Sequence, residues 1–303
     1  MAAALTIGRA APGRVATLFS EGIEPEPPLT PARRQRRRAV LFRESTTRGI
    51  ARHALAIAAA LRPSRLRATV AALDFLIRET GIAPAGLPDP AQALAVPDGL
   101  CGLALDLSPD VMMEAYARGL APRGLIGPAT WWAPQTRRLV TPTRRPAPGG
   151  FSVTLDRDFD LTLATCARPA PGRLPITPLT PALVAAFCRL HDAGFAHAYD
   201  VCDAQGRRAA GGFGVAIGRV FVLEATFAFA DGAHAAGLCA LADALAAFGF
   251  VALDVTAIKP ISLPATNVER AAHARLVADN LAGGRLGRWT LPPPARAALR
   301  LAA

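Results

Sequence analysis

Two carboxylates at the ends of apolar segments are the strongest candidates for chemistry in this sequence. Glu224 follows the run "GRVFVL", and Asp254 ends the run "FVALD". A carboxylate in such surroundings is costly to ionise unless it has a partner. Beside an amine, it can orient the amine or accept its proton. The alternative is that each acid caps a helix or pairs with an arginine, which is a purely structural role.

The segment around Glu224 predicts three antiparallel strands. They span "FAHAYDVCDAQGRRAAGGFGVAIGRVFVLEATF" and turn at "DAQG" and "IGR". Glycines such as Gly211 and Gly212 permit close backbone approach, and backbone N–H groups at a strand bulge can hold an oxyanion. Helical patterns flank this meander, at "TPALVAAFCRLHDAG", "GAHAAGLCALADALAAFG" and "NVERAAHARLVADNL". Strands followed by returning helices indicate an α+β fold.

The N-terminal half predicts a helical hairpin. "TRGIARHALAIAAAL" ends before Pro63, and "SRLRATVAALDFLIRET" follows with Leu66, Val70, Leu73 and Ile77 on one face. We expect four regions: a loosely ordered tail over 1–47, a hairpin and linker over 48–96, a small domain over 97–148, and the α+β domain over 149–303.

The charge pattern favours a polyanionic partner. The 303 residues carry a net charge of +11, and five arginines lie between Arg33 and Arg38. Such a surface attracts nucleic acid, although compositional bias or a solvated tail explains it equally well.

The five cysteines are unclustered, which predicts reduced thiols in a cytoplasm and no zinc or other metal site. No segment has the length of apolar sequence that crosses a membrane.

Adjacent tryptophans mark a further candidate surface. In "IGPATWWAPQTRRLV", Trp131 and Trp132 point to opposite sides of an extended segment. One is expected in the core, and the other is a possible platform for a base or an aromatic ring.

Five sequence blocks, in matching order and spacing, resemble those of the leucyl/phenylalanyl-tRNA–protein transferases. "GLCGLALDLSPDVMMEAYARGLAPR" matches the family's "GLLAxGGDLSPExLLxAYrrGIFPW", and "TWWAPQTR" matches "LWWSPdPR". "PIT…LHDAGFAHAYDVC" matches "WIT…LHxxGxAHSvEvW", and "AAGGFGVAIGRVFVLEATFAF" matches "LVGGxYGvxxGxxFxgESMFS". "LDVT…SLPATNVER" matches "iDCQ…SLGAxxIPR". The likeness covers about 97–286.

The resemblance implies a GNAT-like acyltransferase domain after a small N-terminal domain. It implies aminoacyl-tRNA as co-substrate, a protein N-terminus or small amine as acceptor, and no cofactor. We expect a cytoplasmic monomer. The residues implied for catalysis are Glu224, Asp254 and Thr256. The residues expected to bind substrate are Trp131, Trp132, Arg123, Pro175, Gly211, Gly212 and Phe227. If the protein uses tRNA, the arginines expected to bind it are Arg137, Arg138, Arg144 and Arg145, which lie near the Trp131–Trp132 segment in the sequence.

Several replacements distinguish this chain from the family pattern. Arg123 and Pro175 stand where the family has tryptophans, and Thr256 replaces a glutamine. A hydroxyl cannot reproduce the paired contacts of an amide. We therefore keep two alternatives: an acyl-CoA-dependent N-acyltransferase of the same fold, and a binding homologue without catalysis. The segment "FAFADGAHAAGLCA" lacks the usual CoA pyrophosphate signature.

Overall fold

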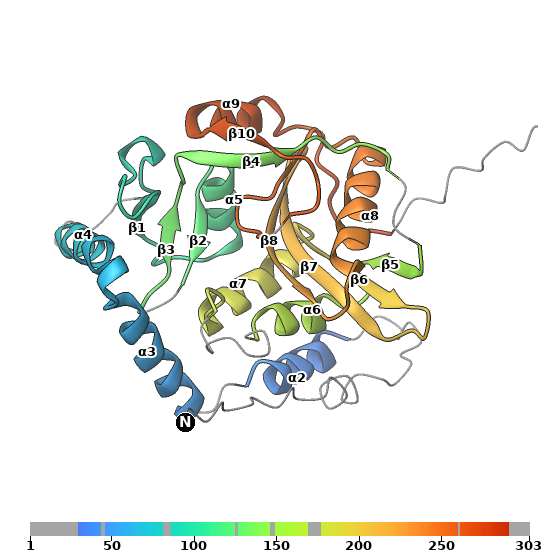
Figure 1. The fold of residues 1–303 in the computed structure, drawn as a ribbon, viewed down its shortest axis with the longest axis horizontal. Coiled ribbons are helices and arrows are strands. Elements are labelled where there is room, and N and C mark those ends of the chain that lie inside the picture. The colour runs from blue at the N-terminus through green and yellow to red at the C-terminus, as the bar shows by residue number, and fades with distance from the viewer. Residues whose placement is uncertain are drawn as a thin grey trace, which may run out of the picture.

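The computed structural model describes residues 30–43, 46–80, 86–124, 127–145, 149–168, 177–259 and 261–290. It confirms the α+β class. The larger sheet has the strand order β10-β4-β9-β8-β7-β6-β5 (Figure 1). Its strands are β4 (Thr136–Val140), β5 (Phe151–Leu155), β6 (Ala196–Asp203), β7 (Arg208–Ile217), β8 (Val220–Ala228), β9 (Ala252–Asp254) and β10 (Thr266–Glu269).

The expected meander forms β6, β7 and β8, which pair antiparallel around the predicted turns. Every other neighbouring pair in this sheet is antiparallel except β8 with β9, which is parallel. A second, smaller sheet has the order β1-β3-β2. It consists of β1 (Leu100–Leu103), β2 (Ala121–Arg123) and β3 (Thr130–Trp132).

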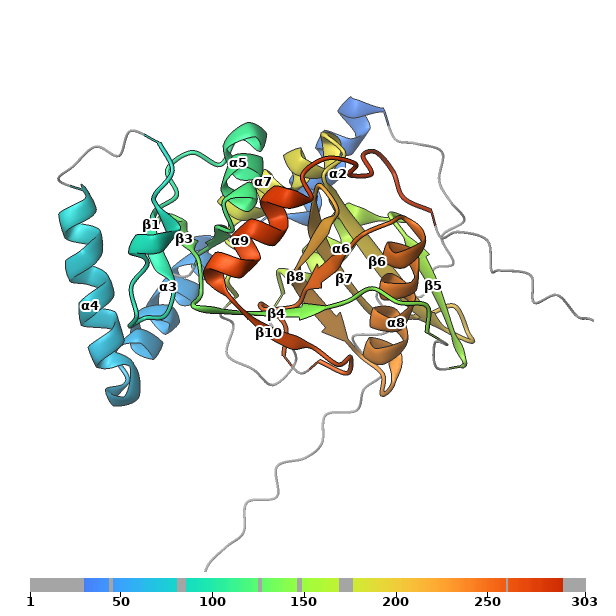
Figure 2. The ribbon, with the colours of Figure 1, turned by 90° about the horizontal axis from the view of Figure 1, so that it is seen from above.

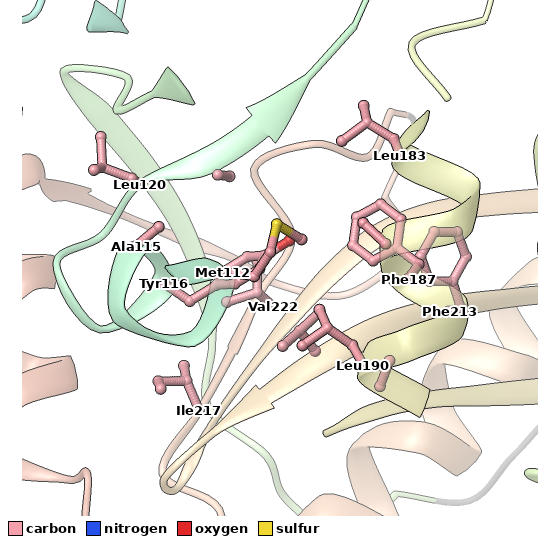
Figure 3. Close-up of a cluster of buried hydrophobic side chains, with 14 of the residues drawn as sticks. Met112, Ala115, Tyr116, Leu120, Leu183, Phe187, Leu190, Phe213, Ile217 and Val222 are labelled. Carbon is pink, nitrogen blue, oxygen red and sulfur yellow. The ribbon is translucent and has the colours of Figure 1, made fainter. Parts of the chain in front are cut away.

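Helices cover both faces of the larger sheet. The core on one side includes residues of α5, α6 and α7, and the core on the other side includes residues of α8. In Figure 3, side chains of α5 and α7 meet those of β7 and β8 in the first of these cores. The bounds are α5 (Pro109–Ala117), α6 (Phe159–Cys166), α7 (Pro181–Asp192), α8 (Ala233–Ala247) and α9 (Arg270–Asp279).

The boundary expected at residue 148 does not separate the two sheets. The strand β4, which precedes it, lies inside the larger sheet between β10 and β9. The strand β10 occupies residues that the sequence suggested as the start of the last helix. Its register against β4 runs from Thr266–Leu139 to Glu269–Thr136. A strand of mostly exposed residues has no strong local signal, so pairing with β4 determines it.

The helical hairpin forms as expected, at one end of the molecule (Figure 2). The helix α3 (Thr46–Ala60) precedes α4 (Pro63–Thr80), and a short 3₁₀ helix, η2 (Pro90–Gln92), follows. None of the described helices is long and apolar enough to cross a membrane.

The arginine-rich segment forms a helix, which contradicts the prediction of a loosely ordered tail for these residues. Residues 31–41 form the helix α2, with Thr30 as N-cap and Pro31 in the first turn. Three of its five arginines pair with acids elsewhere in the fold: Arg34 with Asp192 at 3.0 Å, Arg37 with Asp158 at 2.5 Å, and Arg38 with Asp160 at 2.9 Å. Residues 31–41 are therefore not a loosely ordered tail, and these arginines are engaged within the protein. Residues 1–29 lie outside the described part.

Candidate active site

The candidate site lies where β8 and β9 part. Their parallel pairing runs from Val220–Ala252 to Val222–Asp254. The strand β9 ends there, whereas β8 continues to Ala228. Glu224 and Asp254 are thus both at the point of separation. The end of the β8–β9 pairing therefore brings the two carboxylates to the same edge of the strand pair.

A β-bulge places Glu224. In the β7–β8 ladder, Phe213 pairs with Ala225 and the next residue, Gly214, pairs with Leu223. Glu224 is the extra residue on β8. A bulge bends a strand locally and redirects a side chain. Here it allows Glu224 to point toward α5 and β2, between the apolar side chains of β8.

Glu224 is buried and held by two donors. Its side chain is 1% exposed. The Tyr116 hydroxyl donates to its Oε1 at 2.7 Å, and Arg123 Nη1 donates to its Oε2. Burial and the negative charge of Glu224 raise the pKa of Tyr116, so the hydroxyl stays protonated and remains a donor. Glu224 therefore pairs with an arginine, as the structural alternative expected, and this arginine is Arg123, which we had expected to bind substrate.

Asp254 is also buried, in a separate set of contacts. Its Oδ2 lies 3.2 Å from both Arg137 Nη1 and His273 Nε2, and its Oδ1 accepts from the Thr256 hydroxyl at 2.5 Å. Burial alone would raise the pKa of Asp254. The close contact with His273 and the charge of Arg137 outweigh burial and hold that pKa below its ordinary value. Asp254 is therefore a stable carboxylate.

Both carboxylates lie on one face of the sheet. Val222 and Leu139, which flank Asp254 across the ladder, belong to the core on the α5 side. Glu224 reaches Tyr116 of α5, which belongs to the same core. A shared pocket requires this arrangement, since carboxylates on opposite faces would exclude it. The pocket itself stays a prediction.

Thr256 has a positioning role here. Its hydroxyl donates to Asp254 and accepts from the backbone N–H of Arg138 at 2.9 Å. Its own N–H donates to Asp254 Oδ1 at 2.8 Å. Thr256 therefore fixes the carboxylate of Asp254 and the adjoining strand β4. Its expected direct contact with substrate stays a prediction.

Two of the four arginines expected to bind tRNA are engaged inside the protein. Arg137 is buried, pairs with Asp254 and donates to the carbonyl of Gly119. Arg138 donates to the carbonyls of Val255 and Ile258. A buried, paired guanidinium cannot reach a phosphate, so the prediction for Arg137 is wrong. Arg138 is half-buried and held by backbone carbonyls, which disfavours the same role. Arg144 is exposed and Arg145 half-buried.

As expected, one tryptophan lies in the core and the other lies near the surface. Trp131 is 2% exposed and belongs to the core, which argues against a role in binding substrate. Trp132 is half-buried, and its Nε1 donates to the Thr130 hydroxyl at 2.7 Å. Trp132 is therefore the better candidate for a platform. Pro175 lies outside the described residues.

The glycines serve the packing of the sheet. A Cβ on Gly211 would lie 2.7 Å from the Phe227 ring, and one on Gly212 would lie 2.7 Å from the carbonyl of Ala225. Their close contacts are thus with neighbouring strands and side chains. Phe227 is half-buried, 5.2 Å from the Phe229 ring, with the Arg208 guanidinium 5.8 Å away.

Sequence reasoning missed two residues of the site. Tyr116 lies in the block "LSPDVMMEAYARGL", whose family counterpart also contains tyrosine, so the resemblance offered a signal for it. His273 had no such signal, because a histidine inside "AAHARL" of α9 resembles any core histidine. Two other histidines have structural contacts: His191 Nδ1 lies 2.7 Å from the carbonyl of Ala196, and His197 Nδ1 lies 2.8 Å from Asp156.

Comparisons with known proteins identify the family of this chain. The family model described as leucyl/phenylalanyl-tRNA protein transferase matches residues 135–278, from the residue before β4 almost to the end of α9. This match and the relatives described in the next paragraph place the chain among the transferases, which are enzymes. It belongs to the leucyl/phenylalanyl-tRNA–protein transferase family.

Three relatives illustrate the likeness, each named leucyl/phenylalanyl-tRNA–protein transferase. The protein of Pseudomonas entomophila (strain L48) is 36% identical over 180 residues, covering 55% of this chain and 77% of the relative. That of Desulfatibacillum aliphaticivorans is 33% identical over 217 residues, covering 67% and 92%. That of Xanthomonas axonopodis pv. citri (strain 306) is 34% identical over 232 residues, covering 72% and 92%. These relatives support the transferase hypothesis over the two alternatives.

Proposed function

We propose that this protein transfers an aminoacyl group from aminoacyl-tRNA to an amine acceptor, the N-terminus of a protein. Family membership supports the reaction class. The observation that carries the proposal is the buried Glu224, fixed at a β-bulge by Tyr116 and Arg123 beside the end of β9. The parallel strand pair and the bulge also support the GNAT-like character of the domain.

The reaction is aminolysis of an ester. The acceptor amine forms a C–N bond to the carbonyl carbon, and the bond from that carbon to the ribose oxygen of tRNA breaks. The proton lost by the amine ends on that ribose oxygen. Much of the rate can come from holding the two reactants in position. A rigidly held carboxylate and nearby donors suit this task.

Glu224 has the capacity to orient an amine. A carboxylate offers about four lone-pair positions, and the bonds from Tyr116 and Arg123 use one on each oxygen. The remaining positions can accept from an amino group. Arg123 supplies positive charge beside the same place, and its side chain is 29% exposed. Its guanidinium is therefore suited to stabilise the oxyanion of the tetrahedral intermediate.

The test is transfer of labelled leucine or phenylalanine from charged tRNA to a peptide with an N-terminal arginine. Glu224→Gln keeps the size of the side chain but removes its charge, and we expect transfer to fall by about 10²-fold or more. Asp279→Asn, at an exposed position on α9, is the matched control and should retain activity. Absence of transfer by the folded wild type with a panel of aminoacyl-tRNAs, or full activity of Glu224→Gln, would refute the proposal.

A further inference from the structure

The exposed apolar side chains of this protein are concentrated in the helical hairpin. Among the described residues, seven of the thirteen exposed large apolar side chains belong to this hairpin, six of them on α3 and α4 and one in the turn between the helices. A concentration of this kind on a protein surface marks an interaction site. The seven are Ile50 and Ile57 on α3, Leu61 in the turn, and Leu66, Val70, Leu73 and Ile77 on α4.

The four residues on α4, which we call the α4 stripe, have the spacing of a coiled-coil seam. Successive members are four, three and four residues apart, so they follow the a and d positions of a heptad. The stripe lies outside the packing of the hairpin, because Leu73 and Ile77 remain 55% and 69% exposed. The helix α4 contacts α3 and β1, and its half-buried residues at positions 68, 69, 71, 72, 75 and 76 all lie off the stripe.

We propose that the α4 stripe binds the α4 stripe of a second copy of this chain, with the two helices antiparallel. The spacing of four, three and four residues is the same in both chain directions. A two-fold axis therefore places each residue of the stripe opposite a residue of the partner's stripe. Leu66 then packs against the partner's Ile77, and Val70 packs against the partner's Leu73. Such self-complementarity is what a two-fold symmetric interface requires.

The charged residues beside the α4 stripe favour a second copy of this chain as the binding partner and an antiparallel orientation of the two helices. Arg67 and Asp74 each follow a d residue and so hold the e position, one heptad apart. Antiparallel pairing brings Arg67 beside the partner's Asp74, and the two-fold axis repeats the contact. Asp74 also pairs with Arg78 of its own helix at 3.0 Å, an exposed pair that leaves its carboxylate accessible to a second guanidinium. Parallel pairing would set Arg67 level with the partner's Arg67. Charges at e positions determine partner choice and orientation in coiled coils. This dimer replaces the monomer expected from the sequence.

The test is sedimentation velocity of the full chain over a concentration series. We expect a monomer–dimer equilibrium for the wild type and a monomer for Leu73→Glu. Leu73 is solvent-exposed and glutamate is a good helix former, so the variant should keep wild-type circular dichroism and thermal unfolding. Leu105→Glu replaces an equally apolar side chain, 69% exposed, outside the hairpin, and should leave the dimer unchanged. A wild type that stays monomeric, or Leu73→Glu that still dimerises, overturns the proposal.

Charge reversal tests the register independently of the apolar contacts. Arg67→Asp places like charges at two symmetry-related contacts and should weaken the dimer by about tenfold. Combining Arg67→Asp with Asp74→Arg should restore wild-type affinity. Equal affinities for all three proteins would refute the antiparallel register. Wild type that is monomeric in solution but co-sediments with phosphatidylglycerol vesicles would show that the stripe binds lipid instead, which also overturns the proposal.

Discussion

At the scale of single residues, Arg123 determines the electrostatic character of the candidate site. It stands where the resembled sequence block has tryptophan, and its guanidinium pairs with the buried Glu224. The charge of Glu224 raises the pKa of Arg123 against the opposing effect of burial. The tryptophan of the resembled block is thus replaced by an arginine that pairs with the candidate catalytic acid. The aminoacyl pocket is therefore expected to differ from one lined by tryptophan.

Removing the guanidinium should leave Glu224 as a buried charge without its cationic partner. We predict that Arg123→Met lowers the free energy of unfolding by about 1–3 kcal/mol, because one oxygen of Glu224 loses its donor. The measurement is urea unfolding. Adding Glu224→Gln should recover part of the loss, since the uncompensated charge is gone. Strictly additive losses in this double-mutant cycle would show that the two side chains do not interact.

At the scale of elements, α2 is the segment whose position depends most on ion pairs. Arg38 pairs with both Asp160 of α6 and Asp192 of α7, and Arg34 pairs with Asp192 at 3.0 Å. No residue of α2 is fully buried. Its attachment therefore rests on charge-assisted contacts more than on apolar burial, which makes it sensitive to salt and to acid.

We predict that Arg38→Ala loosens α2. Asp160, 7% exposed, loses a charged donor, which costs about 1–3 kcal/mol for a buried group. Hydrogen exchange should show loss of protection in residues 31–41. Arg33→Ala, at an exposed position of the same helix, is the control and should leave protection unchanged. Equal protection in both variants would mean that other contacts hold the helix.

The contact of Arg38 with Asp192 predicts that the stability of α2 depends on pH. Burial would raise the pKa of Asp192, but hydrogen bonds and charge from Arg38 and Arg34 lower it below 3.8. A carboxylate with a lowered folded-state pKa stabilises the protein above its unfolded-state pKa, and this stabilisation is lost as pH falls through the folded-state pKa. Protection of α2 should therefore decline in acid below about pH 4. In Arg38→Ala the decline should be shallower.

At the scale of the whole molecule, folding reduces the set of arginines that can contact RNA. Of the six arginines around the Trp131–Trp132 segment, three are held inside the protein. Arg123 pairs with Glu224 and Arg137 with Asp254, while Arg138 binds backbone carbonyls. Arg118, whose pair with Glu114 lies on the surface, Arg144, which is exposed, and Arg145, which is half-buried, remain as candidates.

We predict that Arg144→Ala makes the salt dependence of tRNA binding shallower. Each phosphate contact contributes about 0.7–0.9 to the slope of log K against log salt, and loss of one contact should remove that amount. The measurement is tRNA binding over a salt series. Arg36→Ala, an exposed arginine on α2, controls for net charge. Equal changes of slope in the two variants would indicate non-specific attraction by the net charge of +11.

Local signals in the sequence determined most of the elements. The three strands from Ala196 to Ala228 and the helices α7 and α8 follow from periodicity, turn residues and caps, which act over a few positions. The hairpin was predictable for the same reason. Glu224 and Asp254 could be selected as site residues because an acid at the end of an apolar run is unusual whatever surrounds it.

Tertiary structure decided everything that depends on distant partners. The strand β10 exists because β4 pairs with it, and α2 is positioned by acids of α6 and α7. Glu224 is bonded to residues 101 and 108 positions away in the sequence, and Arg137 to one 117 positions away. A charge can be stabilised by any counter-ion that the fold brings within a few ångströms. Residue types alone therefore predicted that Glu224 needs a partner, while only the packing of β2 and α5 against β8 determined that Arg123 and Tyr116 provide it.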